Sequence, residues 1–88
     1  MKVLKFGAVW CADCLVMRPM WQEVEKQIPG FETEYYDADE SPDALKKYKV
    51  KNIPECIFLD QDGQEIFRLQ GIQNKEDILK AVKENLDK

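Results

Sequence analysis

The chain has 88 residues, of which 44% are hydrophobic and 34% are charged, and it carries a net charge of −4 without any histidine. This length and composition are typical of one globular domain, residues 1–88, with room for a single core. The absence of a basic run argues against nucleic-acid binding, and no segment is long and apolar enough to cross a membrane.

The first two predicted elements are a strand and a helix. Residues 3–10 are short, apolar and rich in β-forming side chains, which predicts a strand. Residues 12–28 carry apolar side chains at steps of three and four, which predicts a helix that Pro19 should kink. Cys14 begins this apolar stripe and should point inward. Cys11 precedes the first turn and should be more exposed.

The rest of the chain alternates between strands and helices. The predicted elements are a strand at 32–38, a short helix capped by Ser41, strands at 56–60 and 65–70, and a last helix capped by Asn74. The Asp62-Gly63 pair predicts a hairpin between the last two strands. The helices between the earlier strands imply parallel crossovers. We therefore expect an α/β domain in the order β-α-β-α-β-β-α, with a four-stranded mixed sheet flanked by helices.

Cys11 and Cys14 form a C-x-x-C pair at the start of the first predicted helix. Two thiols at this spacing can close into a disulfide and reopen, and the positive end of a helix dipole stabilises a thiolate there. The same pair is also half of a zinc site. Because histidine is absent and the chain has three cysteines, one usual zinc ligand is missing, which favours disulfide chemistry.

Several motifs together resemble the thioredoxin superfamily. They are the segments 6–14, 36–42 and 50–54, Pro19 five residues after the second cysteine, and the glycines Gly63 and Gly71. The resemblance covers nearly the whole chain and implies a thioredoxin-like fold, truncated because the chain begins at the strand before the cysteines. It also implies that the Ile53-Pro54 peptide bond is cis and packs beside Cys11 and Cys14.

The chain departs from the family pattern around the two cysteines. Ala12-Asp13 replaces the usual Gly-Pro dipeptide, and Asp13 also stands where glutaredoxins usually carry a tyrosine. Lys5 occupies the position of a buried aspartate that aids proton transfer in thioredoxins, and Tyr35 stands where the lysine partner of that aspartate would be. Lys5 and Tyr35 are therefore candidates for proton transfer near Cys14. The alternative is that Lys5 reaches solvent or pairs with a strand carboxylate such as Glu34.

The resemblance gives roles to the site residues. Cys11 would attack a substrate disulfide, and Cys14 would then attack Cys11 and release the reduced substrate. Trp10 would shield the site, and the backbone of Ile53 beside Pro54 would pair with an extended substrate strand. The remaining residues that shape the site would be Ala12, Asp13 and Gly71.

Three further side chains near the motifs have two interpretations each. The Asp13 carboxylate could oppose a thiolate on Cys11 and make the pair more reducing, or it could simply favour the first turn of the helix. Cys56 is interpreted as a buried core thiol, with a third redox or ligand cysteine as the alternative. Glu55 would join Asp13 in making the rim of the site acidic.

We therefore expect a thiol–disulfide oxidoreductase that reduces protein disulfides, binds no cofactor or metal and acts as a monomer. Its partners would be disulfide-containing proteins and an electron-donating reductase or small thiol. Since the N-terminal residues lack the apolar stretch of a signal peptide, we expect a cytoplasmic location. The alternatives are a redox-inactive adaptor with the same fold, and a metal or iron–sulfur protein that uses the C-x-x-C pair.

Overall fold

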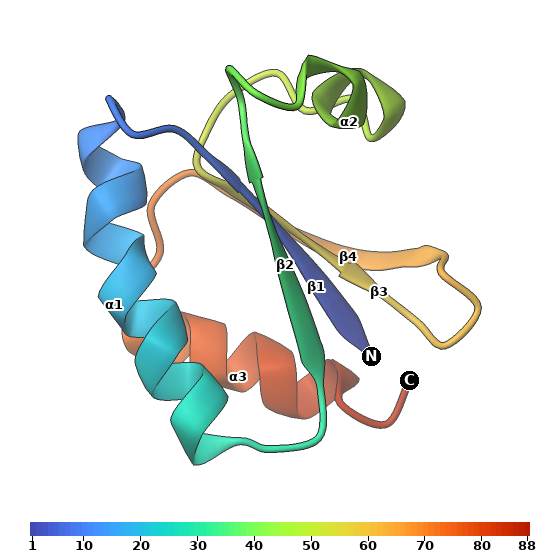
Figure 1. The fold of residues 1–88 in the computed structure, drawn as a ribbon. Coiled ribbons are helices and arrows are strands. Elements are labelled where there is room, and N and C mark those ends of the chain that lie inside the picture. The colour runs from blue at the N-terminus through green and yellow to red at the C-terminus, as the bar shows by residue number, and fades with distance from the viewer.

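The computed structural model describes residues 1–88 and has the expected order of elements (Figure 1). The elements are β1 (Lys2–Gly7), α1 (Ala12–Gln27), β2 (Glu32–Asp37), α2 (Pro42–Lys47), β3 (Glu55–Leu59), β4 (Glu65–Gln70) and α3 (Lys75–Asn85). The strands form a four-stranded sheet in the order β2-β1-β3-β4. The sheet is mixed, because β1 is parallel to β2 and antiparallel to β3, and β3 is antiparallel to β4.

The sheet contains one parallel crossover, β1-α1-β2, so the expectation of a second was wrong. The helix α2 lies at the end of the sheet where β2 ends and β3 begins (Figure 1). A second parallel crossover would have required the chain to return to the opposite end of the sheet first. After α2 the chain instead enters β3 at the same end of the sheet at which β2 finished. As a result, β3 runs against β1.

The first strand is shorter than expected, since it ends at Gly7 and residues 8–10 form a turn. The Cys11 amide donates to the Ala8 carbonyl at 3.2 Å and closes this turn. Val9 and Trp10 are exposed although they are apolar. The apolar run of residues 3–10 predicted a longer strand. In the structure, the strand stops at Gly7, and Val9 and Trp10 lie on the surface next to the cysteines.

The core has one layer on each face of the sheet. On the face covered by α1 and α3, the buried side chains are Val3, Met17, Trp21, Val24, Ile28, Cys56, Phe58, Ile78, Ala81 and Val82. On the face covered by α2, they are Leu4, Phe6, Val50, Ile57 and Leu59. Burying one such large side chain contributes about 1.5–3 kcal/mol, so these two layers hold the helices on the sheet.

Two helices begin where the sequence predicted, at Ser41 and Asn74. The Asn74 side chain accepts a hydrogen bond from the Asp77 amide at 2.8 Å and caps α3. Ser41 occupies the cap position of α2 but makes no capping hydrogen bond through its side chain.

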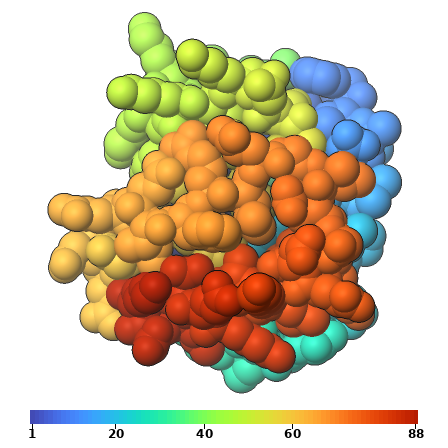
Figure 2. Space-filling model, turned by 180° about the vertical axis from the view of Figure 1, so that it is seen from behind, coloured from blue at the N-terminus to red at the C-terminus, as the bar shows by residue number.

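Seen from behind, the orange β4 hairpin lies between the green α2 and the red α3 (Figure 2). None of the helices combines the length and apolarity needed to span a lipid bilayer.

Candidate active site

Cys11 immediately precedes α1. It occupies the N-terminal cap, and its sulfur accepts a hydrogen bond from the Cys14 amide at 3.3 Å. A helix N-terminus has amide groups without intrahelical partners and the positive end of the helix dipole. Both features favour negative charge on the Cys11 sulfur.

Cys14 lies one turn further along α1 and lines a pocket of about 250 Å³. Burial, and after it the Cys11 sulfur beside it, raises the pKa of Cys14 to about 12. Both cysteines are partly exposed, so accessibility does not separate them as the sequence predicted. Their surroundings do separate them: Cys14 faces the pocket, and Cys11 does not line it.

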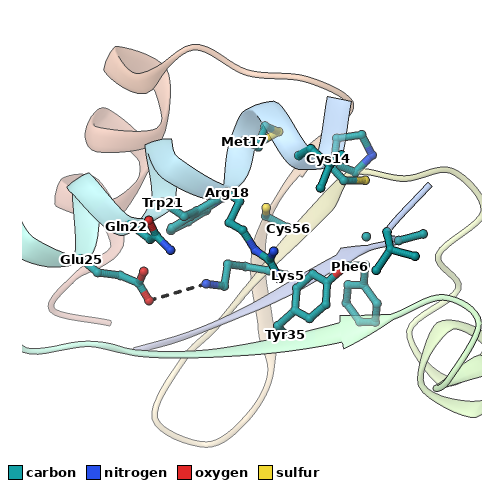
Figure 3. Close-up of a pocket in the computed structure, with 15 residues that line it drawn as sticks. Lys5, Phe6, Cys14, Met17, Arg18, Trp21, Gln22, Glu25, Tyr35 and Cys56 are labelled. Carbon is teal, nitrogen blue, oxygen red and sulfur yellow. Dashed lines mark ion pairs between the residues drawn. The ribbon is translucent and has the colours of Figure 1, made fainter. Parts of the chain in front are cut away.

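The pocket lies between α1 and the sheet, and Lys5 lies on its floor (Figure 3). The Lys5 ammonium is 3.6 Å from the Glu25 carboxylate of α1 and 5.8 Å from the centroid of the Trp21 ring. It points along the pocket toward Glu25 and away from Cys14 (Figure 3).

Lys5 does not pair with Glu34, the strand carboxylate that the sequence offered as an example within one of two alternatives. Glu34 instead pairs with Lys2 at 2.6 Å. Lys5 is in register with Tyr35, whereas Glu34 is in register with Leu4, so Glu34 lies on the other face of the sheet. The sequence could not identify Glu25 as the partner, because it comes from a helix and lies twenty positions away.

Tyr35 lines the same pocket from β2. Its hydroxyl lies 3.2 Å from the point where a Cβ on Gly7 would stand, and the Cys14 sulfur lies 3.2 Å from the same point. The Arg18 guanidinium stands 5.8 Å from the centroid of the Tyr35 ring. Burial raises the pKa of Tyr35, so its hydroxyl keeps its proton at neutral pH. The sequence suggested Tyr35 but gave no indication of Gly7 or Arg18.

The segment with Pro54 borders the pocket that Cys14 lines. The Ile53-Pro54 bond is cis, as the resemblance implied, and Pro54 lines the pocket together with Cys14. The Gly71 amide donates to the Pro54 carbonyl at 2.8 Å. Gly71 has a φ of 79°, a left-handed conformation that favours glycine. This hydrogen bond joins the end of β4 to the Pro54 segment.

Trp10 is 66% exposed and immediately precedes Cys11. Its indole N–H donates to the Asp39 carboxylate at 2.8 Å, which fixes the orientation of the ring. Asp39 follows β2 and is 29 positions away in the chain. The sequence placed Asp39 in a turn, and only the parallel pairing of β1 with β2 brings it beside Trp10.

Glu55 does not contribute to an acidic rim, so that expectation was wrong. Its side chain is only 2% exposed and pairs with Arg68 of β4 at 3.1 Å. Arg68 also donates to the Tyr48 carbonyl at 2.8 Å, so it connects β3, β4 and the end of α2. The alternation of β3 turns Glu55 toward the α2 face of the sheet and away from the cysteines.

Cys56 is a core thiol, as expected, with 3% of its surface exposed. Burial raises the pKa of Cys56 to about 12.

Ala12 and Asp13 are exposed on the first turn of α1. No group of three His, Cys, Asp or Glu side chains is arranged to hold a metal ion.

These features can be compared with known proteins. The family model described as Thioredoxin matches residues 1–84. The chain belongs to the thioredoxin family. A thioredoxin from Staphylococcus aureus is 30% identical over 86 residues, which cover 97% of this chain and 82% of that protein.

Solved thioredoxin structures share this fold. A crystal structure of the thioredoxin NaTrxh from Nicotiana alata has a TM-score of 0.90 at 26% identity, covering 97% of this chain and 72% of that one. A second solved structure comes from work on the structural basis of the thiol resolving mechanism in yeast mitochondrial 1-Cys peroxiredoxin via glutathione/thioredoxin systems. Its TM-score is 0.85 at 30% identity, with 94% of this chain and 76% of that chain covered. The family relationship supports a thiol–disulfide oxidoreductase at the level of the family.

Proposed function

We propose that this thioredoxin-family protein reduces disulfide bonds in proteins by cycling Cys11 and Cys14 between dithiol and disulfide. The observation that carries the proposal is the difference between the surroundings of the two sulfurs. The Cys11 sulfur accepts the Cys14 amide at a helix N-terminus, whereas the pKa of Cys14 is raised to about 12. A thiolate is the attacking species in disulfide exchange, so Cys11 is the first nucleophile.

The cycle has two steps. The Cys11 thiolate attacks one sulfur of a substrate disulfide, forming a mixed disulfide and releasing the other sulfur as a thiolate that takes a proton from water. Cys14 then loses its proton and attacks the Cys11 sulfur, which forms the Cys11–Cys14 disulfide and releases the second substrate sulfur. The substrate gains two electrons and the protein loses two. Because the two sulfurs are already adjacent, the second step is effectively intramolecular.

The surface around Cys11 supports a protein substrate. Val9, Trp10 and Ile72 are large apolar side chains with 72%, 66% and 49% of their surface exposed. Val9 and Trp10 precede Cys11, and Ile72 follows Gly71, whose amide is bonded to the Pro54 carbonyl. Exposed apolar side chains that cluster at one place are typical of interaction surfaces. The backbone of Ile53 would pair with an extended segment of the substrate.

Two partners would complete the cycle of a monomeric protein. The first is a protein that carries a disulfide, and the second is a reductase or small thiol that returns two electrons to the Cys11–Cys14 disulfide.

Lys5 has no part in this scheme, since its ammonium is paired with Glu25. Asp13 is exposed beside both cysteines, and its charge opposes a nearby thiolate. We therefore propose that the Asp13 charge makes the Cys11–Cys14 pair more strongly reducing.

The experiment that tests the proposal is dithiothreitol-driven reduction of insulin. We expect turnover by the unaltered protein and none above background by Cys11→Ser or Cys14→Ser. Cys56→Ala is the matched control, because it removes a buried thiol and leaves the pair intact, and it should retain turnover. An unaltered protein that is folded and yet inactive would instead support a binding adaptor and would refute the proposal.

A further inference from the structure

Gly7 lies against two groups that come from different elements. A side-chain carbon at this position would stand 3.2 Å from the Cys14 sulfur of α1 and 3.2 Å from the Tyr35 hydroxyl of β2. Since carbon and sulfur need about 3.5 Å or more, any larger residue would push these groups apart. Glycine therefore lets the hydroxyl and the sulfur both lie against the end of β1, without a hydrogen bond between them in this structure.

The Tyr35 side chain is held in this place by its neighbours. Tyr35 is in register with Lys5 of β1, and its ring points along the strand toward the Cys14 end of the pocket (Figure 3). The Arg18 guanidinium, one turn after Cys14 on α1, stands 5.8 Å from the ring centroid. A cation near an aromatic ring contributes about 0.5–1 kcal/mol at a partly exposed site. The hydroxyl is thus the polar end of an oriented ring.

Cys14 must lose its proton before it can attack Cys11, and its surroundings oppose that loss. Burial and the sulfur of Cys11 raise its pKa to about 12. The titratable and charged groups that surround Cys14 and Tyr35 are Cys11, Asp13 and Arg18 of α1, Lys5 of β1, Asp37 of β2 and Cys56 of β3. Lys5 is turned to Glu25, so it does not serve Cys14. The protonated hydroxyl of Tyr35 is the neutral donor at this end of the pocket.

We propose that the Tyr35 hydroxyl donates a hydrogen bond to the Cys14 sulfur as the thiolate forms, and so accelerates the step in which Cys14 resolves the mixed disulfide. This inference rests on the proposed disulfide-reducing function and adds a residue to it. In this step, the Cys14 proton passes to water while the tyrosine keeps its own. The Cys14 thiolate then bonds to the Cys11 sulfur, and the substrate sulfur leaves with the electron pair of the broken bond.

The experiment follows the reaction of the reduced protein with the aromatic disulfide dithiobis(nitrobenzoate) by stopped flow. Attack by Cys11 releases one coloured thionitrobenzoate at a rate that rises with reagent concentration. Attack by Cys14 on the mixed disulfide releases the second at a rate that does not. Cys56 is 3% exposed and does not contribute on this time scale. The two steps are therefore measured separately in one trace.

Tyr35→Phe removes only the hydroxyl. We expect it to slow the second phase about tenfold at neutral pH and to leave the first phase unchanged, since a hydrogen bond to a charged group is worth at least that factor. The pH profile of the second phase should also move to higher pH. Tyr36→Phe is the matched control, because the Tyr36 hydroxyl donates to Glu34 at 2.7 Å and lies on the other face of the sheet.

Three results would overturn the inference. They are a second phase that is unchanged in Tyr35→Phe, an equal slowing of both phases, and an equal slowing of the second phase in Tyr36→Phe. An unaltered protein that never releases the second thionitrobenzoate would instead contradict the proposed function itself. Failure of the inference is therefore distinguishable from failure of the function.

Discussion

Removing the Arg68 side chain should destabilise the protein strongly, although Arg68 lies far from the two cysteines in sequence. Arg68→Met leaves the Glu55 carboxylate, which is 2% exposed, without its partner at 3.1 Å. It also removes the hydrogen bond to the Tyr48 carbonyl. Glu55 immediately follows Pro54, so the same change loosens the segment beside Cys14.

The magnitude follows from burial. At about 3 Å and an effective dielectric constant of about 20, two unit charges attract by about 5 kcal/mol. Breaking a buried pair by removing one partner costs about 3–5 kcal/mol. A domain of this size has a free energy of unfolding of roughly 5–10 kcal/mol, so Arg68→Met should remove a large part of it. The second carboxylate on Arg68, Glu65, is 42% exposed, and its pair is worth less than about 1 kcal/mol.

The assay is urea unfolding of Arg68→Met, Glu55→Gln, the double variant and Glu65→Gln. We expect Arg68→Met to lose about 3–5 kcal/mol, Glu65→Gln to lose less than about 1 kcal/mol, and the double variant to be more stable than Arg68→Met alone. If Arg68→Met costs the same with Glu55 or Gln at position 55, the two side chains are not coupled. That result would refute the reasoning.

Four further predictions concern the site. Gly71→Ala should destabilise the protein by about 1–2 kcal/mol in urea unfolding, because alanine is strained at a φ of 79°; an unchanged stability would contradict this. In Cys11→Ser, alkylation of Cys14 should still rise with pH above about pH 8.5, because burial, the largest cause of the raised pKa of Cys14, remains when the Cys11 sulfur is removed, and a plateau at that pH would be inconsistent with it. Asp13→Asn should raise the redox potential of the pair by about 15 mV, from a repulsion of roughly 0.7 kcal/mol over about 6 Å of water, and a lower potential in redox titration would oppose this. Lys5→Met should leave the rate of the resolving step unchanged, because the ammonium points to Glu25; a slower step would restore Lys5 as a proton carrier.

The parts of the fold that depend on local patterns were predictable from sequence. The apolar stripe of α1, the cap at Asn74 and the Asp62-Gly63 hairpin each depend on residues within one or two turns of chain. The Pro54 segment followed from a resemblance rather than from physics, since most X-Pro bonds are trans. The cysteine pair was evident because its chemistry depends on two neighbours in sequence.

The parts that depend on pairing across the sheet were not predictable. The direction of β3 depends on which end of the sheet α2 covers, and no local pattern records that. The partners of Lys5 and Glu55 were missed because they come from α1 and β4. The sequence did not single out Gly7, because its place beside Cys14 depends on Tyr35, which comes from β2. Charge and backbone pairs between distant elements become visible only when the sheet order is known.

The central claim is that Cys11 attacks and Cys14 resolves. It is tested most directly by mixing reduced Cys14→Ser and Cys11→Ser with a disulfide-bonded protein such as insulin and locating the mixed disulfides by peptide mass spectrometry. The account predicts a stable adduct on Cys11 of Cys14→Ser and almost none on Cys14 of Cys11→Ser. An adduct that forms as readily on Cys14 would contradict it.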